Sequence, residues 1–441
     1  MSSRILIRGG CVLTLGAKTP NHLEADVMVE GDKVVEVGRE LRSRDAAVID
    51  ATDTIVMPGF VDTHRHAWRS LFRNLGEGGP GENDPAVYGS HIEPEDVYAA
   101  ILIGLLGAVE AGITTVVDCC DVLFDDAFTE AALQAHADAG LRTVFVHSPP
   151  RWAEDHRRDG SDLRTFVAQH GHQIGPTTIA SGTSDPSEGL DEVAAEWARA
   201  RDLGLRSHTH AGSTRADRGA VAALGERGLL GPDVTLVHCT SLDGGDLDAV
   251  AAAGAAVSLT PSSEMAGGLG SPPMQQLIDR GIRPGLGIGD ERVAPGDMFA
   301  PMRGAISLQH ATYFDLKLAG KAGLPHLLTT RQVIRYATSD GATAIGLGDL
   351  TGSLEPGKQA DIVVLRADRP NIAPVNDPIG AVVWGMDTSN VDWVFAAGRA
   401  LMRNGTLEGD VERARRLAVA AQRRVATAAG LAVGSAAGGE R

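Results

Sequence analysis

The chain has 441 residues, of which 43% are hydrophobic and 22% charged, so it can build a sizeable core over two or three domains. A formal net charge of −17 without a basic stripe excludes the nucleic-acid-binding classes, which need a concentrated basic surface. With no run of about twenty apolar residues, no signal peptide and four cysteines in no disulfide pattern, we expect a soluble cytoplasmic protein.

Both ends of the chain carry short alternating runs broken by turns, a pattern typical of β-strands. The N-terminal runs predict a small antiparallel sheet with strands at residues 4–9, 11–15, 26–30, 33–37 and 47–50. After Gly352 the same pattern predicts strands at 361–365, 381–384 and 391–396. We therefore expect one small β-sandwich domain built from both chain ends, residues 1–54 and 353–405. Residues 406–441 are expected to hold a C-terminal helix, at 410–429, and a disordered tail.

The middle of the chain, residues 55–352, has a different rhythm. Eight short apolar runs recur at 55–62, 114–118, 143–147, 177–181, 206–210, 234–238, 256–260 and 284–289. Helix-length amphipathic segments lie between many of them, at 94–111, 127–139, 187–203, 247–253 and 274–279, with further helices at 298–318 and 330–344. Successive β-then-α units predict a closed parallel (β/α)8 TIM-like barrel. Right-handed crossovers would then place the C-terminal ends of all strands at one mouth.

Metal-ligating residue types stand at the predicted ends of four of these strands: His64 and His66, His210, His238 and Asp290. Residues two apart in an extended strand point to the same side, so His64 and His66 can face one ion. Imidazoles together with a carboxylate suit Zn²⁺, and Fe²⁺ or Mn²⁺ less well. Zinc lowers the pKa of a bound water towards about 7, and the resulting hydroxide would be the nucleophile.

A single histidine is more often a surface or capping residue than a ligand. We interpret six histidines in this way: His22, His136, His156, His170, His172 and His326. An HxH pair alone is also a weak indication of a metal. The combination of HxH, two later strand-end histidines and a final strand-end aspartate, in chain order, is what favours a metal site. His208 forms a second HxH with His210 but lies deeper in its strand, so we interpret it as a neighbour of the ligands.

Several segments resemble the amidohydrolase superfamily. Residues 57–66, MPGFVDTHRH, are similar to its PGFVDxHxH opening, and residues 352–364, GSLEPGKQADIVV, to its GSLExGKxADxVV signature. Between these two motifs, the segments TH at 209–210, LVHC at 236–239 and GIGD at 287–290 match further motifs of the superfamily. The resemblance spans about residues 4–405. It is strongest for the mononuclear-metal branch that contains cytosine and guanine deaminases, S-adenosylhomocysteine deaminase and the triazine hydrolases.

The resemblance implies a single divalent ion held by His64, His66, His210 and Asp290. It also implies that His238 polarises the substrate or steadies the attacking water, and that Asp290 carries a proton to the leaving group. Two-metal members commonly bridge their ions with a carboxylated lysine on the fourth strand. The lysines of this chain stand away from the predicted strand ends, at positions 18, 33, 317, 321 and 358, which favours one metal.

One position departs from the deaminases of this branch, which usually carry glutamate three residues after the fifth-strand histidine. Ser213 stands there in this chain, and serine is far too weak an acid to replace a carboxylate, so simple heterocycle deamination is in question. We hypothesise that Glu264, after the seventh strand, supplies the missing acid or binds an amino-bearing or cationic substrate. The alternative is an exposed loop glutamate. Glu291 is a weaker candidate for the same role.

Other residues near the predicted mouth are candidates for substrate contact. Trp68 could stack on a flat ring, although a packing role is equally open, and His147 ends the third strand facing the pocket. Arg69 and His91 also belong to this region. The Gly-rich segment 76–81 predicts a loop over the mouth, and it lacks the strand–Gly–helix context of a phosphate site.

We therefore predict a metal-dependent hydrolase that attacks an sp² carbon of a small nitrogen heterocycle. It would act as a deaminase or amidohydrolase on non-peptide carbon–nitrogen bonds. Two alternatives stay open: a non-hydrolytic isomerase or lyase on the same fold, and a catalytically silent binding protein. Relatives of this branch are frequently dimers, so the resemblance leaves a homodimer open, and no nucleic-acid or membrane partner is expected.

Overall fold

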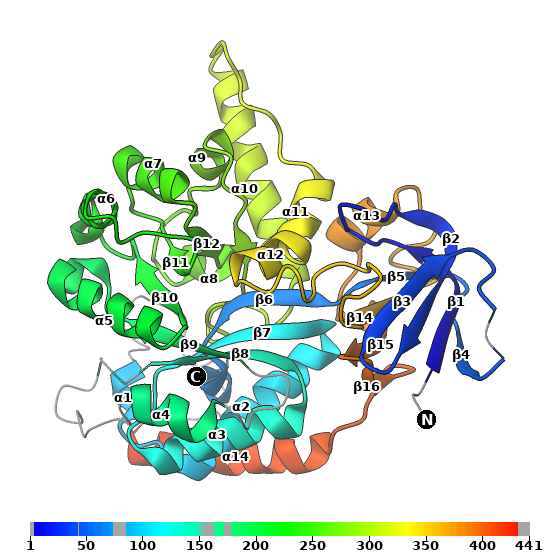
Figure 1. Ribbon diagram of the computed structural model, residues 1–441, viewed down its shortest axis with the longest axis horizontal. Coiled ribbons are helices and arrows are strands. Elements are labelled where there is room, and N and C mark those ends of the chain that lie inside the picture. The colour runs from blue at the N-terminus through cyan, green and yellow to red at the C-terminus, as the bar shows by residue number, and fades with distance from the viewer. Residues whose placement is uncertain are drawn as a thin grey trace, which may run out of the picture.

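The computed structural model describes residues 4–42, 44–73, 85–148, 150, 152, 163–171 and 178–430 (Figure 1). Its strands form an eight-stranded sheet and a nine-stranded sheet. The segment 76–81, the tail from 431, His156 and His172 lie outside the described residues. Among the described helices, none combines the length and the apolar character needed to cross a membrane.

The eight-stranded sheet is the predicted barrel. Its strands follow chain order: β6 (Phe60–Arg65), β7 (Ile113–Cys120), β8 (Arg142–His147), β9 (Thr178–Thr183), β10 (Arg206–Ala211), β11 (Val234–His238), β12 (Ala256–Leu259) and β13 (Gly285–Leu286). Each strand pairs in parallel with the next. A parallel bridge between Arg65 and Gly289 returns the chain to β6, so the prediction of a TIM-like barrel is confirmed.

Helices connect the barrel strands as the amphipathic segments predict. They are α1 (Pro85–Gly89), α2 (Pro94–Glu110), α3 (Asp126–Ala139), α4 (Leu163–His170), α5 (Leu190–Asp202), α6 (Ala220–Glu226), α7 (Gly244–Ala253), α8 (Pro261–Ala266) and α9 (Met274–Asp279). The short helical turns η1 (Ala67–Phe72), η3 (Pro186–Glu188) and η4 (Arg215–Asp217) lie in the connections. Local sequence fixes the helix ends: Glu93 and Asp96 form a capping box at the start of α2, and Gly140 ends α3 in the left-handed conformation. Every residue of β7 is buried, because a barrel strand packs against the interior on one face and helices on the other.

After the last barrel strand come α10 (Phe299–Leu318), α11 (Thr330–Tyr336) and α12 (Ser339–Ala344). The last helix, α14 (Val411–Ala428), lies along α2 (Figure 1). An ion pair between Arg424 and Asp96 ties the two helices together. The predicted helices at 298–318 and 410–429 are confirmed, whereas the predicted helix at 330–344 is two helices separated at Ala337 and Thr338.

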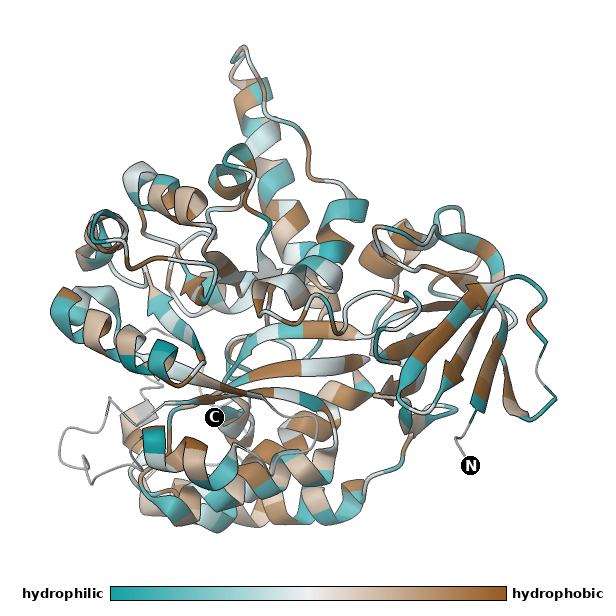
Figure 2. Cartoon of the chain, viewed as in Figure 1, coloured by the Kyte–Doolittle hydropathy of each residue, from teal (hydrophilic) through white to brown (hydrophobic). Residues whose placement is uncertain are grey.

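The nine-stranded sheet is the small domain, and it combines strands from both chain ends. Its members are β1 (Arg4–Val12), β2 (His22–Glu30), β3 (Lys33–Gly38), β4 (Ala46–Asp50), β5 (Thr54–Pro58), β14 (Ile362–Arg366), β15 (Val391–Ala396), β16 (Arg399–Arg403) and β17 (Thr406–Leu407). Apolar residues dominate its strands, which surround a core of their own (Figure 2). The expected small β domain is present, but the sheet is mixed, because β1 runs parallel to both β4 and β5.

Three strand predictions are wrong. The predicted strands at 4–9 and 11–15 are a single strand, β1, which ends at Val12. The predicted barrel strand 55–62 is two strands in different sheets: β5 pairs with β14 in the small domain, and β6 begins the barrel after Gly59. The predicted strand 381–384 is helical, since Asp377 caps α13 (Pro378–Gly380), which runs into η5 (Ala381–Gly385) and is followed by η6 (Thr388–Asn390). A short apolar run reads equally well as a strand or a buried helix, and here Val382 and Val383 are both buried on a helical turn.

Candidate metal centre and active site

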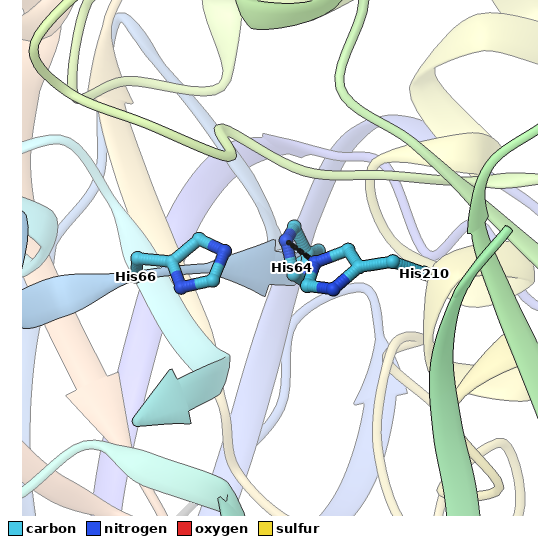
Figure 3. A group of neighbouring side chains, drawn as sticks. All are labelled: His64, His66 and His210. Atoms are coloured by element: carbon cyan, nitrogen blue, oxygen red, sulfur yellow. Dashed lines mark hydrogen bonds between the residues drawn. The ribbon is translucent and has the colours of Figure 1, made fainter. Parts of the chain in front are cut away.

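Three histidines meet at the C-terminal ends of β6 and β10. His64 and His66 come from β6 and the residue just after it, and His210 comes from β10 (Figure 3). One ring nitrogen of each lies within 4.8 Å of the others. Nε2 of His64 and Nε2 of His210 are 3.2 Å apart. Two nitrogens that share a tetrahedral zinc at its usual bond length would lie about 3.4 Å apart, so the donor set fits a divalent metal ion.

Hydrogen bonds on the far side of two rings fix the orientation of these ligands. Nδ1 of His64 bonds Nε2 of His208 at 3.0 Å, and Nδ1 of His66 bonds Oδ1 of Asp121 at 3.1 Å. Both rings therefore keep Nε2 for the ion, an arrangement typical of metal-binding histidines. His208 is thus a neighbour of the ligands, as the sequence predicts.

The electrostatic environment keeps two of the ligands, His64 and His210, neutral. Burial, followed by the adjacent imidazoles, holds the pKa of His64 well below its ordinary value, and burial followed by His238 does the same for the pKa of His210. A neutral imidazole offers the lone pair that a metal requires. The three-histidine group is therefore prepared to bind a cation.

His238 ends β11 beside this group. Its ring stacks on that of His210, with centroids 5.3 Å apart and planes 11° from parallel. The backbone of His238 and of Cys239 takes positive φ values of 73° and 57°, a region that residues with a side chain rarely occupy. Such strain is typical of functional sites, where the surrounding structure imposes it. Nδ1 of His238 lies 3.1 Å from Oε1 of Glu264.

Glu264 lies in α8, directly after β12, and is fully buried. The alternative of an exposed loop glutamate is therefore wrong. Its Oε1 also accepts a hydrogen bond from the backbone N–H of Thr260 at 2.8 Å. The catalytic role predicted for Glu264 stays a proposal, to which we return below.

Asp290 reaches the site through the backbone that closes the barrel. The N–H of Gly289 donates to the carbonyl of His64 at 2.8 Å, so Asp290 follows the ligand strand closely. Its carboxylate pairs with Arg292 at 2.6 Å and with Arg69 at 3.0 Å. Burial opposes ionisation, but the two arginines hold the pKa of Asp290 well below its usual range. Among the described residues, the group of atoms within 4.8 Å contains the three histidines and not Asp290, whose ligand role stays a prediction.

Glu291, the weaker candidate for the missing acid, belongs to a buried ion-pair network. It pairs with Arg65 at 2.9 Å and with Arg73 at 2.6 Å, and it accepts a hydrogen bond from Ser70. Arg65 in turn pairs with Asp62 at 2.7 Å. These contacts lock the loop after β13 against β6 and give Glu291 a structural position.

The residues predicted to contact substrate occupy different environments. His147 ends β8 and packs against Phe166, with ring centroids 4.6 Å apart. Trp68 is fully buried, donates its indole N–H to Asp121 and stacks on Trp152 with centroids 6.3 Å apart. His91 is exposed, and its carbonyl accepts a hydrogen bond from Arg424.

His136, predicted to be a surface or capping residue, is instead buried. It bonds Asp118 at 2.8 Å and Thr143 at 3.0 Å, which is a structural role. Asp121 is the residue that the sequence analysis did not find. It follows the end of β7, and a carboxylate at a barrel strand end is the same indication that pointed to Asp290.

Comparison with known proteins decides the family. The sequence matches the description Amidohydrolase family over residues 55–401. The chain belongs to the amidohydrolase family. This amidohydrolase is 29% identical over 433 residues to the 5'-deoxyadenosine deaminase of Methanothermobacter thermautotrophicus, covering 92% of this chain and 94% of that protein. It is 28% identical over 426 residues to the 5-methylthioadenosine/S-adenosylhomocysteine deaminase of Pelotomaculum thermopropionicum, covering 91% and 93%.

Solved structures share the fold of this amidohydrolase. An adenosine deaminase from Xanthomonas campestris with bound zinc superposes with a TM-score of 0.81 at 22% identity, over 96% of this chain and 99% of that one. The atrazine chlorohydrolase of Arthrobacter aurescens TC1 complexed with zinc gives a TM-score of 0.79 at 22% identity, over 95% and 100%. The predictions of the superfamily, the fold and a metal-dependent hydrolase of non-peptide carbon–nitrogen bonds are confirmed.

Proposed function

We propose that this amidohydrolase is a zinc-dependent deaminase that releases ammonia from the adenine ring of a small nucleoside. The observation that carries the proposal is the three-histidine group at the barrel mouth of a chain that aligns over nine-tenths of its length with deaminases of 5'-deoxyadenosine and 5-methylthioadenosine. In such a reaction water adds to the ring carbon that bears the amino group. The carbon–nitrogen bond then breaks, ammonia leaves, and an oxygen stands in its place.

His64, His66 and His210 would hold the ion, and Asp290 would be the fourth ligand. Zn²⁺ suits this donor set best, with Fe²⁺ or Mn²⁺ as further possibilities of the same chemistry. When bound, the ion would supply a Lewis acid and activate water at neutral pH. Arg69 and Arg292 hold Asp290 ionised, which is the form that a ligand needs.

The protein's own side chains would orient the ring and move protons. His238, stacked on His210, would contact the attacking water or the substrate ring. His147, backed by Phe166, would touch the substrate from the end of β8. Trp68 would act indirectly, because its indole N–H donates a hydrogen bond to Asp121, which in turn contacts His66. Asp290 would pass a proton towards the departing ammonia.

A second candidate is hydrolysis of a different leaving group from a related flat ring. The observation that favours it is Ser213, which stands where deaminases of this branch usually carry glutamate and which cannot serve as a carboxylic acid. This candidate keeps the same metal site and the same attack at an sp² carbon, and it differs only in the group that departs.

An assay of ammonia release distinguishes these functions. Zinc-loaded protein would be incubated with adenosine, 5'-deoxyadenosine, 5'-methylthioadenosine, S-adenosylhomocysteine, an aminotriazine and a chlorotriazine. From at least one adenine nucleoside we expect ammonia and the product that carries oxygen in place of the amino group, in equal amounts. Release of chloride or an amine from the triazines, with no ammonia from any adenine nucleoside, would instead establish the second candidate.

Replacing one ligand tests the metal site directly. We expect His210→Ala to lose most of its bound zinc and at least about 100-fold in turnover, because a catalytic site with two remaining imidazoles holds the ion poorly. Metal content per chain, measured by atomic emission, and turnover are the readouts. His326→Ala, at an exposed histidine, is the matched control and should keep both. Intact metal content in His210→Ala would contradict the proposed site.

A further inference from the structure

A deaminase without glutamate after its fifth-strand histidine needs another carboxylate near the reacting ring. Ser213 is half-buried and carries no carboxylate. Asp121, Asp290 and Glu291, the acids that border the ligand strands, each pair with an arginine. Glu264 differs from them, because its partner is His238.

The contacts of Glu264 fix which nitrogen of His238 carries a proton. Oε1 of Glu264 receives the N–H of Thr260 at 2.8 Å and lies 3.1 Å from Nδ1 of His238. An ionised Glu264 would only accept hydrogen bonds, so the tautomer that suits this contact carries its proton on Nδ1 of His238, whose other neighbour is Oγ1 of Thr260 at 3.3 Å. Nε2 of His238 is then left as an acceptor on the ring that stacks against His210. Oε2 of Glu264 is buried, and it has no hydrogen-bond partner among the described residues.

A carboxylate behind an imidazole is a known way to equip a histidine for proton transfer. The carboxylate selects the tautomer, holds the ring in place and stabilises the positive charge that develops when the other nitrogen takes a proton. The pair here is buried on the carboxylate side, where the charge of Glu264 acts across a medium of low dielectric constant.

We propose that Glu264 is a positioning residue that acts through His238 and, in this chain, replaces the carboxylate missing at position 213. The inference rests on the proposed function, since it assigns the proton path of that reaction. A proton of the attacking water passes to Nε2 of His238 as the oxygen bonds to the ring carbon. His238 then passes this proton to the ring nitrogen beside that carbon. Asp290 carries the second proton of the water to the amino group as the carbon–nitrogen bond breaks and ammonia leaves, and Glu264 keeps its charge throughout.

Glu264→Gln separates the charge of this side chain from its shape. The glutamine oxygen can still accept from Thr260 and His238, whereas the negative charge is gone. We expect kcat to fall at least about 100-fold, with KM within about threefold of the wild type and one zinc per chain retained. Glu226→Gln, the same substitution at an exposed glutamate, is the matched control and should leave kcat unchanged.

Two outcomes of this comparison would overturn the proposal. A kcat of Glu264→Gln within about twofold of the wild type would show that the charge is not used. A fall in kcat that is matched by an equal fall in zinc content would show that Glu264 only maintains the fold of the site.

A spectroscopic measurement tests the pairing without any substrate. In zinc-loaded protein labelled with ¹⁵N-histidine, the signals of His238 are assigned by their loss in His238→Asn. We expect the proton on Nδ1 and a bare Nε2. A proton on Nε2 with a bare Nδ1 would overturn the proposal. If the wild type releases no ammonia from adenine nucleosides, the proposed function fails, and this measurement still decides whether Glu264 and His238 form the pair.

Discussion

Asp121 gathers three donors from one short stretch of chain. It accepts hydrogen bonds from His66 at 3.1 Å and Arg69 at 2.8 Å, and also from the indole of Trp68. Burial opposes ionisation of Asp121, but His66 and Arg69 hold its pKa well below the usual range. A permanently ionised carboxylate behind a ligand imidazole raises the basicity of that ring and fixes its plane. Asp121 thereby links the metal centre to the buried Trp68, which stacks on Trp152.

Substituting this carboxylate should weaken the metal site without abolishing it. We expect Asp121→Asn to lower zinc affinity by about 10- to 100-fold, because the amide keeps its shape and one acceptor but loses the charge. Competition with a chromophoric chelator gives the dissociation constant. Asp202→Asn, at an exposed aspartate, is the control, and an unchanged affinity in Asp121→Asn would contradict this role.

Sequence patterns identify site residues where backbone geometry alone dictates their direction. His64, His66 and His210 could be predicted, because side chains alternate along strands and strand ends gather at one mouth. The buried position of Glu264 could not, since nothing in the local sequence shows that its side chain lies against His238. The three hydrogen bonds to Asp121 could not be predicted either. They depend on the directions of the side chains that follow β6, which only the packed structure determines.

At the scale of elements, the contact between β6 and the chain after β13 sets the ligand geometry. Gly287 lies so close to β6 that an added Cβ would stand 2.7 Å from both the backbone nitrogen and the carbonyl oxygen of His64. Backbone cannot give way as a flexible side chain can. Glycine here lets the chain that leads to Asp290 approach the strand that carries two metal ligands.

We expect Gly287→Ala to displace His64 or the chain around Gly289, and so to reduce both thermal stability and zinc content. Overpacking of this kind typically costs about 1–3 kcal/mol. The melting temperature and the metal stoichiometry are the measurements. Gly244→Ala, at the first residue of α7, is the control, because the nearest atom to its added Cβ is the end of the flexible Arg280 side chain.

Strands and helices were predicted correctly where the spacing of apolar residues clearly indicated one of the two. Strands such as 143–147 and 234–238 and helices such as 94–111 coincide with β8, β11 and α2. Within the mostly apolar run 55–62, Pro58 and Gly59 mark the turn at which one sheet ends and the other begins, so this boundary could have been predicted. By contrast, a short apolar run does not by itself distinguish a strand from a buried helix. For this reason, 381–384 could not be told from a buried helix.

At the scale of the molecule, a buried ion pair joins the barrel to the small domain. Arg142 of β8 pairs with Asp361 at 2.9 Å, and both side chains are almost completely buried. Asp361 also accepts hydrogen bonds from Thr351 at 2.6 Å and from the backbone of Ala397 at 2.6 Å. The aspartate of the GSLExGKxADxVV signature therefore has a structural role at the junction of the two sheets.

Removing one partner of this pair would leave the other charge buried and alone. We expect Asp361→Ala to cost about 3–5 kcal/mol of stability, visible as a lowered melting temperature of the whole chain. Glu412→Ala breaks an exposed pair with Arg415 and should leave the melting temperature unchanged. An unaltered melting temperature in Asp361→Ala would show that the two domains are held together by other contacts.

The single residue between β5 and β6 has a consequence for how this protein is made. Strand β5 lies between β1 and β14, and β14 leaves the ribosome some three hundred residues after it. Until then, one edge of β5 has no neighbouring strand, although every residue of β5 is buried in the finished protein. Gly59 joins this strand to β6, which leads to the ligands His64 and His66. Unpaired edges of this kind invite aggregation during synthesis. A nascent chain stalled before residue 362 would thus hold most of its barrel yet be a substrate for chaperones.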